Sequence, residues 1–374
     1  MRSENGRIFW FATHPIQYQT PLIRELNKHQ SCEAVFFADD QKGKQFQDKD
    51  GFSDSYGWGV DVLEGVNYHL IQSKSSTTKS FFGVVGKWSS LWRFFKKNPV
   101  KAVIVNGWFP FCYLQVWVVC LVFRVPFFVR GDSNLLMKTG RVKQFVKGVI
   151  LRFLFLFPTS FAYVGELNKK FYLSLGVKPS RIFPAYHTVD KPKGRELPKT
   201  SSAFVIGFLG KHILKKNLEW LIQAMLAWEQ TDWVLKIGGD GPLTQELQRK
   251  YTDSRLHWLG FVRQDKLREF YSVLDGFVLP SSYNETWGLV VNEAMECGVP
   301  CLVSESVGCA PDLVVDFETG FLFDLNDFER IHNGLNNLQK QAVSSRRVKE
   351  HISGFKMEAV AQQLIHGISS QKYS

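Results

Sequence analysis

The chain has few cysteines, and none of them stands at the spacing that disulfide-stapled or metal-binding domains use. Six cysteines are spread over 374 residues, no two of them form a Cys-x-x-Cys pair, and no Cys/His cluster has the spacing of zinc ligands. This pattern predicts small buried thiols in a reducing compartment. We expect neither a bound metal ion nor another resident cofactor.

A long uninterrupted apolar run is also missing. The two most apolar stretches, residues 109–129 and 149–165, are each broken by an arginine and a proline, and the first suits a helix followed by a strand. Residues 1–6 are polar, and the apolar residues after them are too few for the core of a signal peptide. We therefore expect no signal peptide, no membrane span and a cytoplasmic protein.

Acidic residues are scarce in much of the first half of the chain. Asp132 is the only one between Glu64 and Glu166, a stretch that holds 14 Lys and Arg residues. Residues 1–195 contain 28 basic and 13 acidic side chains, a net charge of +15, whereas the rest of the chain has a net charge of −4. Such a one-sided charge predicts an anionic partner. No nucleic-acid-binding motif is present, so we expect a membrane surface and no nucleic acid.

Short apolar segments alternate with helical patterns along the whole chain. The predicted strands are residues 7–13, 34–38, 102–105, 127–129, 204–209, 233–237, 256–259, 276–279 and 300–303. This alternation is typical of an α/β fold with parallel, doubly wound sheets, and the length suggests two domains.

The predicted domain boundary lies in a charged, proline-containing segment without periodicity, residues 191–202. This linker separates a first domain of residues 1–190 from a second domain of residues 203–353. A last helical segment, residues 354–374, follows the second domain.

Two glutamates, Glu285 and Glu293, are the most informative feature of the second domain. After the strand at 276–279, a polar turn leads to a helical pattern from about residue 287, which a glycine and a proline end. One carboxylate is thus expected at a strand end near a helix mouth, where anions and nucleotides bind, and the other inside that helix. Eight helical residues span roughly 12 Å, more than the roughly 5 to 9.5 Å of a carboxylate pair flanking one glycosidic bond. The pair is predicted to hold two parts of one elongated ligand; two solvated glutamates are the alternative.

Residues 280–300 resemble the donor-site signature of the retaining glycosyltransferases of the GT-B fold, the group 1 or family 4 type. The shared pattern is Pro-Ser, a glutamate, a small residue, an aromatic residue and glycine, then Glu-Ala and Gly-x-Pro. Other segments match in the expected order: Gly210-Lys211 with Lys216-Asn217, residues 239–243, 259–262, 310–313 and 319–322, and more thinly residues 13–18. The resemblance is dense from about residue 204 to 325.

This resemblance implies a GT-B architecture, two Rossmann-like domains facing a central cleft, with the last helix crossing back onto the first domain. It also implies transfer of a sugar from a nucleoside diphosphate donor to a glycan or lipid-linked acceptor with retention of configuration, in cell-surface polysaccharide or glycolipid synthesis. The protein would be peripheral on the inner face of the membrane. The metal-using fold would need an Asp-x-Asp motif, and the only such triplet is Asp48-Lys49-Asp50, far from the signature. An epimerase of the same fold and a catalytically silent membrane-associated scaffold remain alternatives.

Three residues are predicted to be catalytic. Lys211 and Lys216 follow a buried strand, where their charges could neutralise a departing diphosphate; Lys215 competes with Lys216 for this role. By resemblance, Glu285 would hold the hydroxyls of the donor sugar and Glu293 those of the ribose. Further donor contacts are predicted for Gly210, Gly260, Phe261, Val262, Thr286, Trp287, Gly288 and Leu289. Lys211, Thr286 and Trp287 depart from the residues most common in the family.

Two residues of the first domain are candidate contacts to the acceptor or donor. His14 lies in a strand-to-helix turn, and Asp132 follows a strand at the position where relatives often place a His or an acid. A structural role is the alternative for both side chains.

Aromatic and basic side chains alternate at helical spacing over residues 79–97. The basic members are Lys87, Arg93, Lys96 and Lys97. The pattern predicts an amphipathic helix that contacts an anionic membrane, with packing of its apolar face in the core as the alternative.

Overall fold

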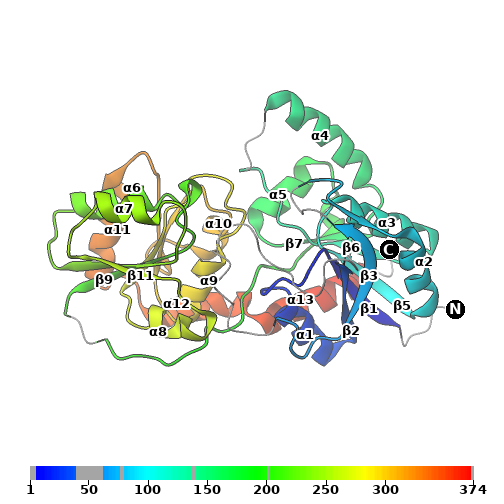
Figure 1. Ribbon diagram of the computed structural model, residues 1–374, viewed down its shortest axis with the longest axis horizontal. Helices are drawn as coiled ribbons and strands as arrows, with labels where there is room; N and C mark the ends of the chain where they lie inside the picture. The colour runs from blue at the N-terminus through cyan, green and yellow to red at the C-terminus, as the bar shows by residue number, and fades with distance from the viewer. Residues whose placement is uncertain (1–5, 39–61, 76–79, 137–139, 200–201, 372–374) are drawn as a thin grey trace.

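The computed structural model describes residues 6–38, 62–75, 80–136, 140–199 and 202–371, whose strands form two separate sheets (Figure 1). The Asp-x-Asp triplet of the sequence, residues 48–50, lies outside the described residues. Among the described helices, none combines the length and the hydrophobicity that crossing a membrane requires. The described cysteines are free thiols, and all are buried except the half-buried Cys297.

The first sheet has the order β4-β3-β2-β1-β5-β6-β7-β8 and is parallel except for β4. Its strands are β1 (Arg7–Ala12), β2 (Cys32–Ala38), β3 (Tyr68–Ser75), β4 (Val84–Gly86), β5 (Val100–Val105), β6 (Phe127–Val129), β7 (Ser160–Tyr163) and β8 (Ile182–Pro184). The apolar run of β1 is buried on both faces, as a central parallel strand requires. Strands β3, β4, β7 and β8 are not among those predicted from the sequence.

Helices cover both faces of this sheet. They are α1 (Thr20–His29), α2 (Trp88–Lys97), α3 (Phe111–Val122), α4 (Arg141–Leu154), α5 (Glu166–Ser174) and the short 3-10 helix η1 (Pro179–Arg181). Helices α2 to α5 share a core with one face, and α1 shares a core with the other face and the C-terminal helix. The apolar stretch 109–129 is a helix followed by a strand, as predicted.

The second sheet is fully parallel, with the order β11-β10-β9-β12-β13-β14. Its strands are β9 (Phe204–Leu209), β10 (Trp233–Gly238), β11 (Leu256–Gly260), β12 (Gly276–Leu279), β13 (Cys301–Ser304) and β14 (Gly320–Phe323). The chain runs from β9 outward to β11 and then returns to β12 on the other side of β9. The ends of β9 and β12 therefore form a topological switch point, where open α/β sheets bind ligands.

The helices of this second domain pack around one continuous apolar core. They are η2 (Leu214–Lys216), α6 (Leu218–Ala227), α7 (Thr244–Lys250), η3 (Gln264–Lys266), α8 (Leu267–Tyr271), α9 (Leu289–Glu296), α10 (Ala310–Leu313), α11 (Phe328–Gln339), α12 (Ser345–Ile352) and η4 (Ser353–Phe355). Gly298 follows α9 with φ +79°, and its N–H bonds Met295 O at 2.8 Å. This left-handed glycine ends the helix where the sequence predicts.

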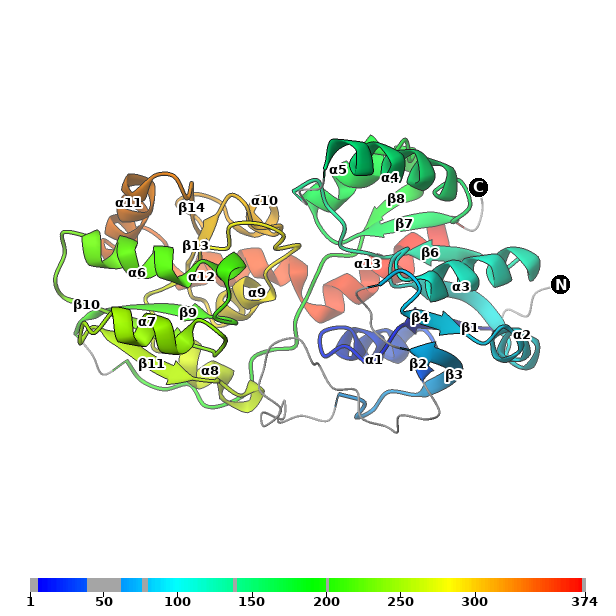
Figure 2. The ribbon, with the colours of Figure 1, turned by 45° about the horizontal axis from the view of Figure 1, so that its top comes forward.

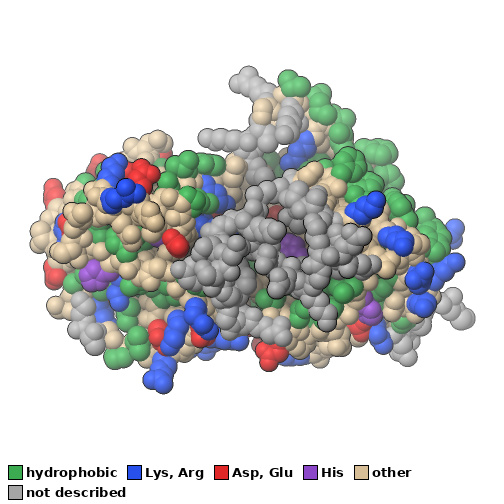
Figure 3. All heavy atoms as spheres, viewed as in Figure 1, with side chains coloured by type: hydrophobic (Ala, Val, Ile, Leu, Met, Phe, Trp, Pro, Cys, Tyr) green, Lys and Arg blue, Asp and Glu red, His purple; other side chains and the backbone are tan. Residues whose placement is uncertain are grey.

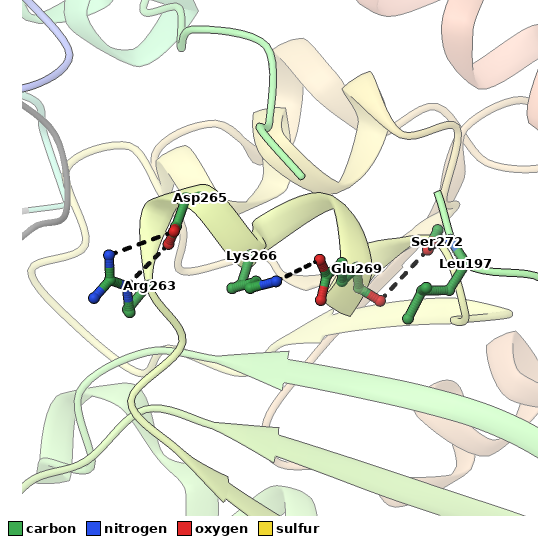
Figure 4. A network of polar contacts seen from close by, with 6 residues as sticks. All are labelled: Leu197, Arg263, Asp265, Lys266, Glu269 and Ser272. Carbon is green, nitrogen blue, oxygen red and sulfur yellow. Dashed lines mark hydrogen bonds and ion pairs between the residues drawn. The ribbon is translucent and has the colours of Figure 1, made fainter. Parts of the chain in front are cut away.

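The segment that joins the domains is attached to the second one. The N–H of Leu197 donates to Ser272 Oγ at 3.0 Å, and Lys199 Nζ lies 2.6 Å from Asp275 Oδ2. Figure 4 shows the first of these contacts beside the ion pairs Arg263–Asp265 and Lys266–Glu269, which run along η3 and α8. Residues 191–199 therefore lie along this surface rather than bridging the domains freely.

The last helix, α13 (Met357–Ser370), returns to the first domain, as Figure 2 shows. It packs against α1 and β8, and its buried face completes the core on that side of the first sheet. Gly367 lies against Phe183, where an added Cβ would stand 2.1 Å from the ring. The helix therefore ties the end of the chain to the domain in which it begins.

The amphipathic helix predicted over residues 79–97 is shorter than expected. Lys79 lies outside the described residues, the strand β4 occupies Val84–Gly86, and α2 begins at Trp88. Its apolar side chains Leu91, Phe94 and Phe95 are buried in the core. The core alternative is therefore correct for this apolar face, while Trp88, Trp92 and the basic residues of α2 stay exposed.

Candidate functional site

The ends of β9, β10 and β11 meet closely at four glycines, Gly210, Gly238, Gly239 and Gly260. The N–H of Gly210, just after β9, donates to Gly238 O at 3.1 Å, and the N–H of Gly239 donates to Gly260 O at 2.7 Å. Gly239 has φ +112°, and a Cβ there would stand 1.9 Å from Gly210 O. Only glycine permits this approach of the backbones.

An ion pair joins the ends of β9 and β12. Lys216 Nζ, from η2, lies 2.6 Å from Glu285 Oε2, and both side chains are largely buried, with 13% and 12% of their surface exposed. The Ser281 hydroxyl donates to the same carboxylate oxygen at 3.2 Å, and Lys215 Nζ lies 3.9 Å away. Burial raises the pKa of Glu285, but Lys216, Lys215 and the hydrogen bonds outweigh it, so the pKa is below its ordinary value.

The lysines outnumber the acid at this point. Lys211 is half-buried two residues after β9, and the aliphatic part of Lys216 lies beside Gly210, 3.7 Å from where its Cβ would be. Lys211, Lys215 and Lys216 all follow within seven residues of the end of β9, and the ammonium groups of Lys215 and Lys216 lie 3.9 Å and 2.6 Å from Glu285 Oε2. The site is therefore suited to bind an anion with more than one negative charge.

The turn between Glu285 and α9 is held by backbone hydrogen bonds from the loop after β13. Gly308 N donates to Glu285 O at 2.9 Å, and Cys309 N donates to Trp287 O at 3.0 Å. Gly288, with φ +104°, is the N-cap of α9. The positive end of this helix dipole is thus fixed next to the lysines, which strengthens the preference for an anion.

Glu293 lies apart from the ion pair, in the second turn of α9. The Tyr271 hydroxyl, at the end of α8, lies 2.9 Å from Glu293 Oε2 and 3.3 Å from Val290 O. Burial raises the pKa of Glu293 to about 7, and the hydrogen bond from Tyr271 lowers it only in part. A carboxyl group poised near neutrality can gain two donors from a diol, and these would favour its ionised form.

The donor contacts predicted at Gly260, Phe261 and Val262 lie at the end of β11 and just after it. Gly260 is exposed with φ +67°, and the other two side chains are half-buried. Val262 packs beside β10, since a Cβ on Gly238 would stand 3.0 Å from its methyl group. These residues therefore extend the same edge of the sheet past Gly239.

The first domain directly contacts the turn between β12 and α9, residues 280–288, which we call the donor loop. Thr286 Oγ1 donates to Asp132 Oδ2 at 3.0 Å, and Asn134 Nδ2 donates to Thr286 O at 3.2 Å. A third contact joins the carboxylate of Asp312 in α10 to the N–H of Glu166 at the start of α5, at 3.0 Å. Burial raises the pKa of Asp312 to about 6, although this hydrogen bond lowers it. The two domains are therefore in contact around the predicted donor loop.

Trp287 occupies this junction as a buried side chain. Its indole N–H donates to Asn292 Oδ1 at 2.7 Å, and Asn292 Nδ2 donates to His187 O at 3.3 Å. The ring also packs against Gly165, where a Cβ would stand 2.2 Å from it. The side chain thus joins the domains and is only 3% exposed, whereas Leu289, the first residue of α9, is half-buried.

His14 follows β1 and Asp132 follows β6, on strands separated by β5, so both lie at the carboxyl edge of the first sheet. Thr13 Oγ1 lies 2.9 Å from His14 Nδ1. Asp132 contacts the donor loop through Thr286. Neither role predicted for these residues is tested by this geometry.

Asn134 and Tyr271 belong to the site, and the sequence analysis did not find them. Each is a single polar residue in a segment without motif spacing, and only the fold places Tyr271 against Glu293 and Asn134 against Thr286. Among the described residues, no three His, Cys, Asp or Glu side chains are grouped closely enough to hold a metal ion.

Residues 191–353 match the family model described as "Glycosyl transferases group 1". The second domain of the chain is therefore similar in sequence to the group 1 glycosyltransferases. The matched region begins at the linker and contains every strand of the second sheet. It therefore contains the Lys216–Glu285 pair and Glu293.

Similar sequences bear glycosyltransferase names. The chain is 28% identical over 179 residues, 46% of its length, to "Uncharacterized glycosyltransferase YqgM" of Bacillus subtilis, and covers 49% of that protein. It is 26% identical over 265 residues, 66% of its length, to a Campylobacter jejuni enzyme named N,N'-diacetylbacillosaminyl-diphospho-undecaprenol alpha-1,3-N-acetylgalactosaminyltransferase, and covers 62% of it. The matches thus span about half to three fifths of these two curated relatives.

The fold extends the similarity over the whole chain. The structure of HepE from Anabaena in complex with UDP superposes with a TM-score of 0.74 at 18% identity, covering 97% of this chain and 100% of that one. This likeness confirms the expected GT-B architecture of two Rossmann-like domains.

Proposed function

We propose that the protein transfers a sugar from a nucleoside diphosphate donor to a glycan or lipid-linked acceptor with retention of anomeric configuration. The main support is the Lys216–Glu285 pair at the switch point of the second sheet, beside Gly210 and the N-terminus of α9. This arrangement offers positive charge to a diphosphate and an ionised carboxylate to the hydroxyls of the attached sugar.

The reaction then depends on charge that develops on the leaving group. As the bond between the sugar and the diphosphate breaks, negative charge grows on the diphosphate and positive charge on the sugar. Lys211, Lys216 and the N-terminus of α9 stabilise the departing diphosphate more than the bound donor, which is the condition for faster turnover. Glu285 orients Lys216 and holds the sugar. The acceptor attacks on the face that the diphosphate leaves, so no protein nucleophile is required.

The nucleoside lies along α9 and the ends of β10 and β11. Glu293 accepts hydrogen bonds from the two ribose hydroxyls, and residues 260–262 contact the base. UDP is the first nucleotide to test, because the superposed HepE structures hold UDP or UDP-glucose.

Thermal unfolding in the presence of UDP-, GDP-, ADP- and dTDP-sugars tests this proposal. A donor at 100 times its Kd stabilises the folded state by about 2.7 kcal/mol, which raises the Tm by several degrees. One nucleotide class should raise the Tm while the others do not. An absence of stabilisation by all four classes would contradict the proposed donor site.

Transfer or hydrolysis of the bound donor should continue in EDTA, because the lysines supply the positive charge that a metal ion provides in other enzymes. The measurement is product formation with EDTA, compared with added Mg²⁺ and Mn²⁺. Strict dependence on a divalent ion would contradict metal-free transfer. Formation of free sugar or of an epimer from the donor alone would instead favour the epimerase, and no turnover with any donor would favour the scaffold.

We also propose that the basic surface of the first domain binds the anionic face of a membrane, the cytoplasmic one. Lys87, Arg93, Lys96 and Lys97 surround the exposed rings of Trp88 and Trp92, and Lys96 Nζ lies 6.0 Å from the Trp92 ring centre. Basic residues near an anionic surface contribute about 1 kcal/mol each, and salt screens this attraction.

Changing these four basic residues to Gln should weaken sedimentation with anionic vesicles at low salt by at least tenfold. High salt should weaken vesicle binding of the unchanged protein, so that the unchanged protein and the variant bind more nearly alike. A matched control changes four exposed basic residues of the second domain, Lys340, Arg346, Arg347 and Lys349, to Gln. Equal binding of the two variants would show that α2 has no special role.

A further inference from the structure

Helix α4 turns its apolar stripe away from the core. Val142, Phe145, Val146, Val149, Ile150 and Phe153 recur at the three- and four-residue spacing of one helix face, yet all are exposed, Val142 by 79%, Phe145 by 73% and Phe153 by 61%. Such a stripe normally faces a protein core. The helix is instead attached through Leu151 and the following Phe155, both buried.

The exposed apolar surface continues from α4 onto α3. Val118, Leu121 and Val122 form a second outward stripe, on a helix that has no charged residue. Figure 3 shows hydrophobic side chains along the upper right edge of the molecule, over α4 and on toward α3 as placed in Figure 1. A continuous apolar surface of this kind marks a binding face.

Aromatic contacts connect the two helices. Lys147 Nζ of α4 lies 5.1 Å from the Trp108 ring centre, and the Trp108 and Phe109 ring centres are 5.8 Å apart. The chain of rings goes on through Phe81 to Phe82, which is exposed and contacts Phe111 at the start of α3. We call the exposed residues of α3 and α4 with Phe82 the apolar face.

The side chains near the apolar face are basic, which favours an anionic partner. Between Asp132 and Glu166 the sequence has no Asp or Glu but has five Lys and Arg residues, and the structure describes the side chains of two of them, Lys147 and Arg152. A second copy of the chain docked symmetrically on the same face would bring like charges together, which is unfavourable. Apolar and aromatic side chains bordered by basic ones are instead the composition of segments that lie in the interface of an anionic bilayer.

We propose that the apolar face inserts into the headgroup region of an anionic membrane, with α4 as the element that penetrates and α2 as its electrostatic support. The loop that precedes α4 carries Asp132 and Asn134, which contact Thr286 of the donor loop. Docking through α4 therefore holds the junction of the domains at the membrane surface. This placement assigns the acceptor to the lipid-linked class. The assignment rests on the proposed transferase function.

The test is sedimentation with vesicles of phosphatidylcholine and phosphatidylglycerol, comparing the unchanged chain with the double variant Phe145→Ser, Phe153→Ser. We expect the variant to lose at least tenfold in partitioning, at low and at high salt, because insertion of apolar surface is not screened. The matched control is Tyr68→Ser with Leu70→Ser. These exposed residues of β3 lie on the opposite face of the first sheet, where Tyr68 contacts Phe36.

Three readouts separate the outcomes. The nucleotide sugar should raise the Tm of the double variant and of the unchanged chain equally. The thermal shift therefore tests the donor site separately from vesicle binding, which tests membrane docking. Equal vesicle binding by all three proteins would overturn the proposal. A concentration-dependent dimer that the double variant abolishes, without vesicle binding, would overturn it in favour of a second copy. If the double variant does not fold, Phe145→Ser alone should still lose several-fold, since that side chain is 73% exposed.

Discussion

Replacing Lys216 with alanine should lower kcat by about 10²- to 10³-fold, the loss of about 2.7–4 kcal/mol seen when one preorganised group that stabilises developing charge is removed. Lys216 lies beside Gly210 and 2.6 Å from Glu285, so its ammonium is held in place before the donor arrives. Its charge matters most when the diphosphate leaves. Binding of the free nucleoside monophosphate should therefore change much less than kcat.

Two variants make this test specific. Lys215→Ala removes the neighbouring ammonium, which lies 3.9 Å from the Glu285 carboxylate instead of 2.6 Å, and should reduce kcat far less. Lys216→Arg keeps the charge and should retain part of the activity. Steady-state kinetics and calorimetry with the monophosphate are the measurements. A Lys216→Ala enzyme with kcat within twofold of normal and greatly weakened binding would identify the lysine as an anchor for the bound donor only.

The second domain could be predicted well because its signals are local. Gly298 ends α9, the apolar segments 204–209 and 276–279 are strands, and Lys216 and Glu285 lie in the segments that follow these two strands. Parallel strands bring their carboxyl ends to one edge, so residues distant in sequence converge there. The spacing of two glutamates on one helix was a weaker guide, because α9 begins only at Leu289 and Glu285 lies in the turn before it.

The first domain shows where such reasoning fails. Strand β3, with the sequence Tyr68–Ser75, carries polar residues on a pattern that resembles a loop, and β7 and β8 are only a few residues long. Their pairing depends on neighbours far along the chain. The apolar residues of α2 suggested a membrane helix, but three of them pack in the core. The stripe of α4 has the same spacing and faces outward, so periodicity alone does not reveal which stripe is covered.

The contacts between domains could not be predicted from local patterns either. Asn134 contacts Thr286, and Trp287 packs on Gly165, across more than 100 residues of sequence. Trp287 illustrates the difficulty, because an aromatic residue within a donor signature suggests a ligand contact. Its indole ring is instead buried between the domains and bonded to Asn292. The family pattern fixes the course of the backbone here, while the tertiary contacts decide what the side chain does.

Replacing Glu293 with glutamine should weaken binding of the intact nucleotide sugar by about 1–3 kcal/mol, the contribution of hydrogen bonds to a charged group. The amide keeps the shape of the side chain but loses one acceptor oxygen and the charge. Glu296→Gln is the matched control, since Glu296 lies on the same helix and burial also raises its pKa, but no bond to Tyr271 is recorded for it. Isothermal titration calorimetry should find the control close to normal.

The pH dependence of the affinity for the nucleotide sugar is a second test of whether Glu293 binds the ribose. Burial raises the pKa of Glu293 to about 7, so in the free protein the carboxyl gains a proton as the pH falls through 7. Ribose hydroxyls donate to the ionised form, and binding must then expel that proton. Affinity should therefore be constant above pH 7 and fall below it, whereas the Glu293→Gln variant should show no such fall. Tyr271→Phe removes the hydrogen bond that lowers the pKa of Glu293. The affinity of this variant for the nucleotide sugar should therefore begin to fall at a higher pH than that of the unchanged protein. The diphosphate of a nucleotide sugar is esterified at both ends and does not titrate in this range. A fall in affinity of equal size in Glu293→Gln would assign the titration to another group and remove Glu293 from the ribose.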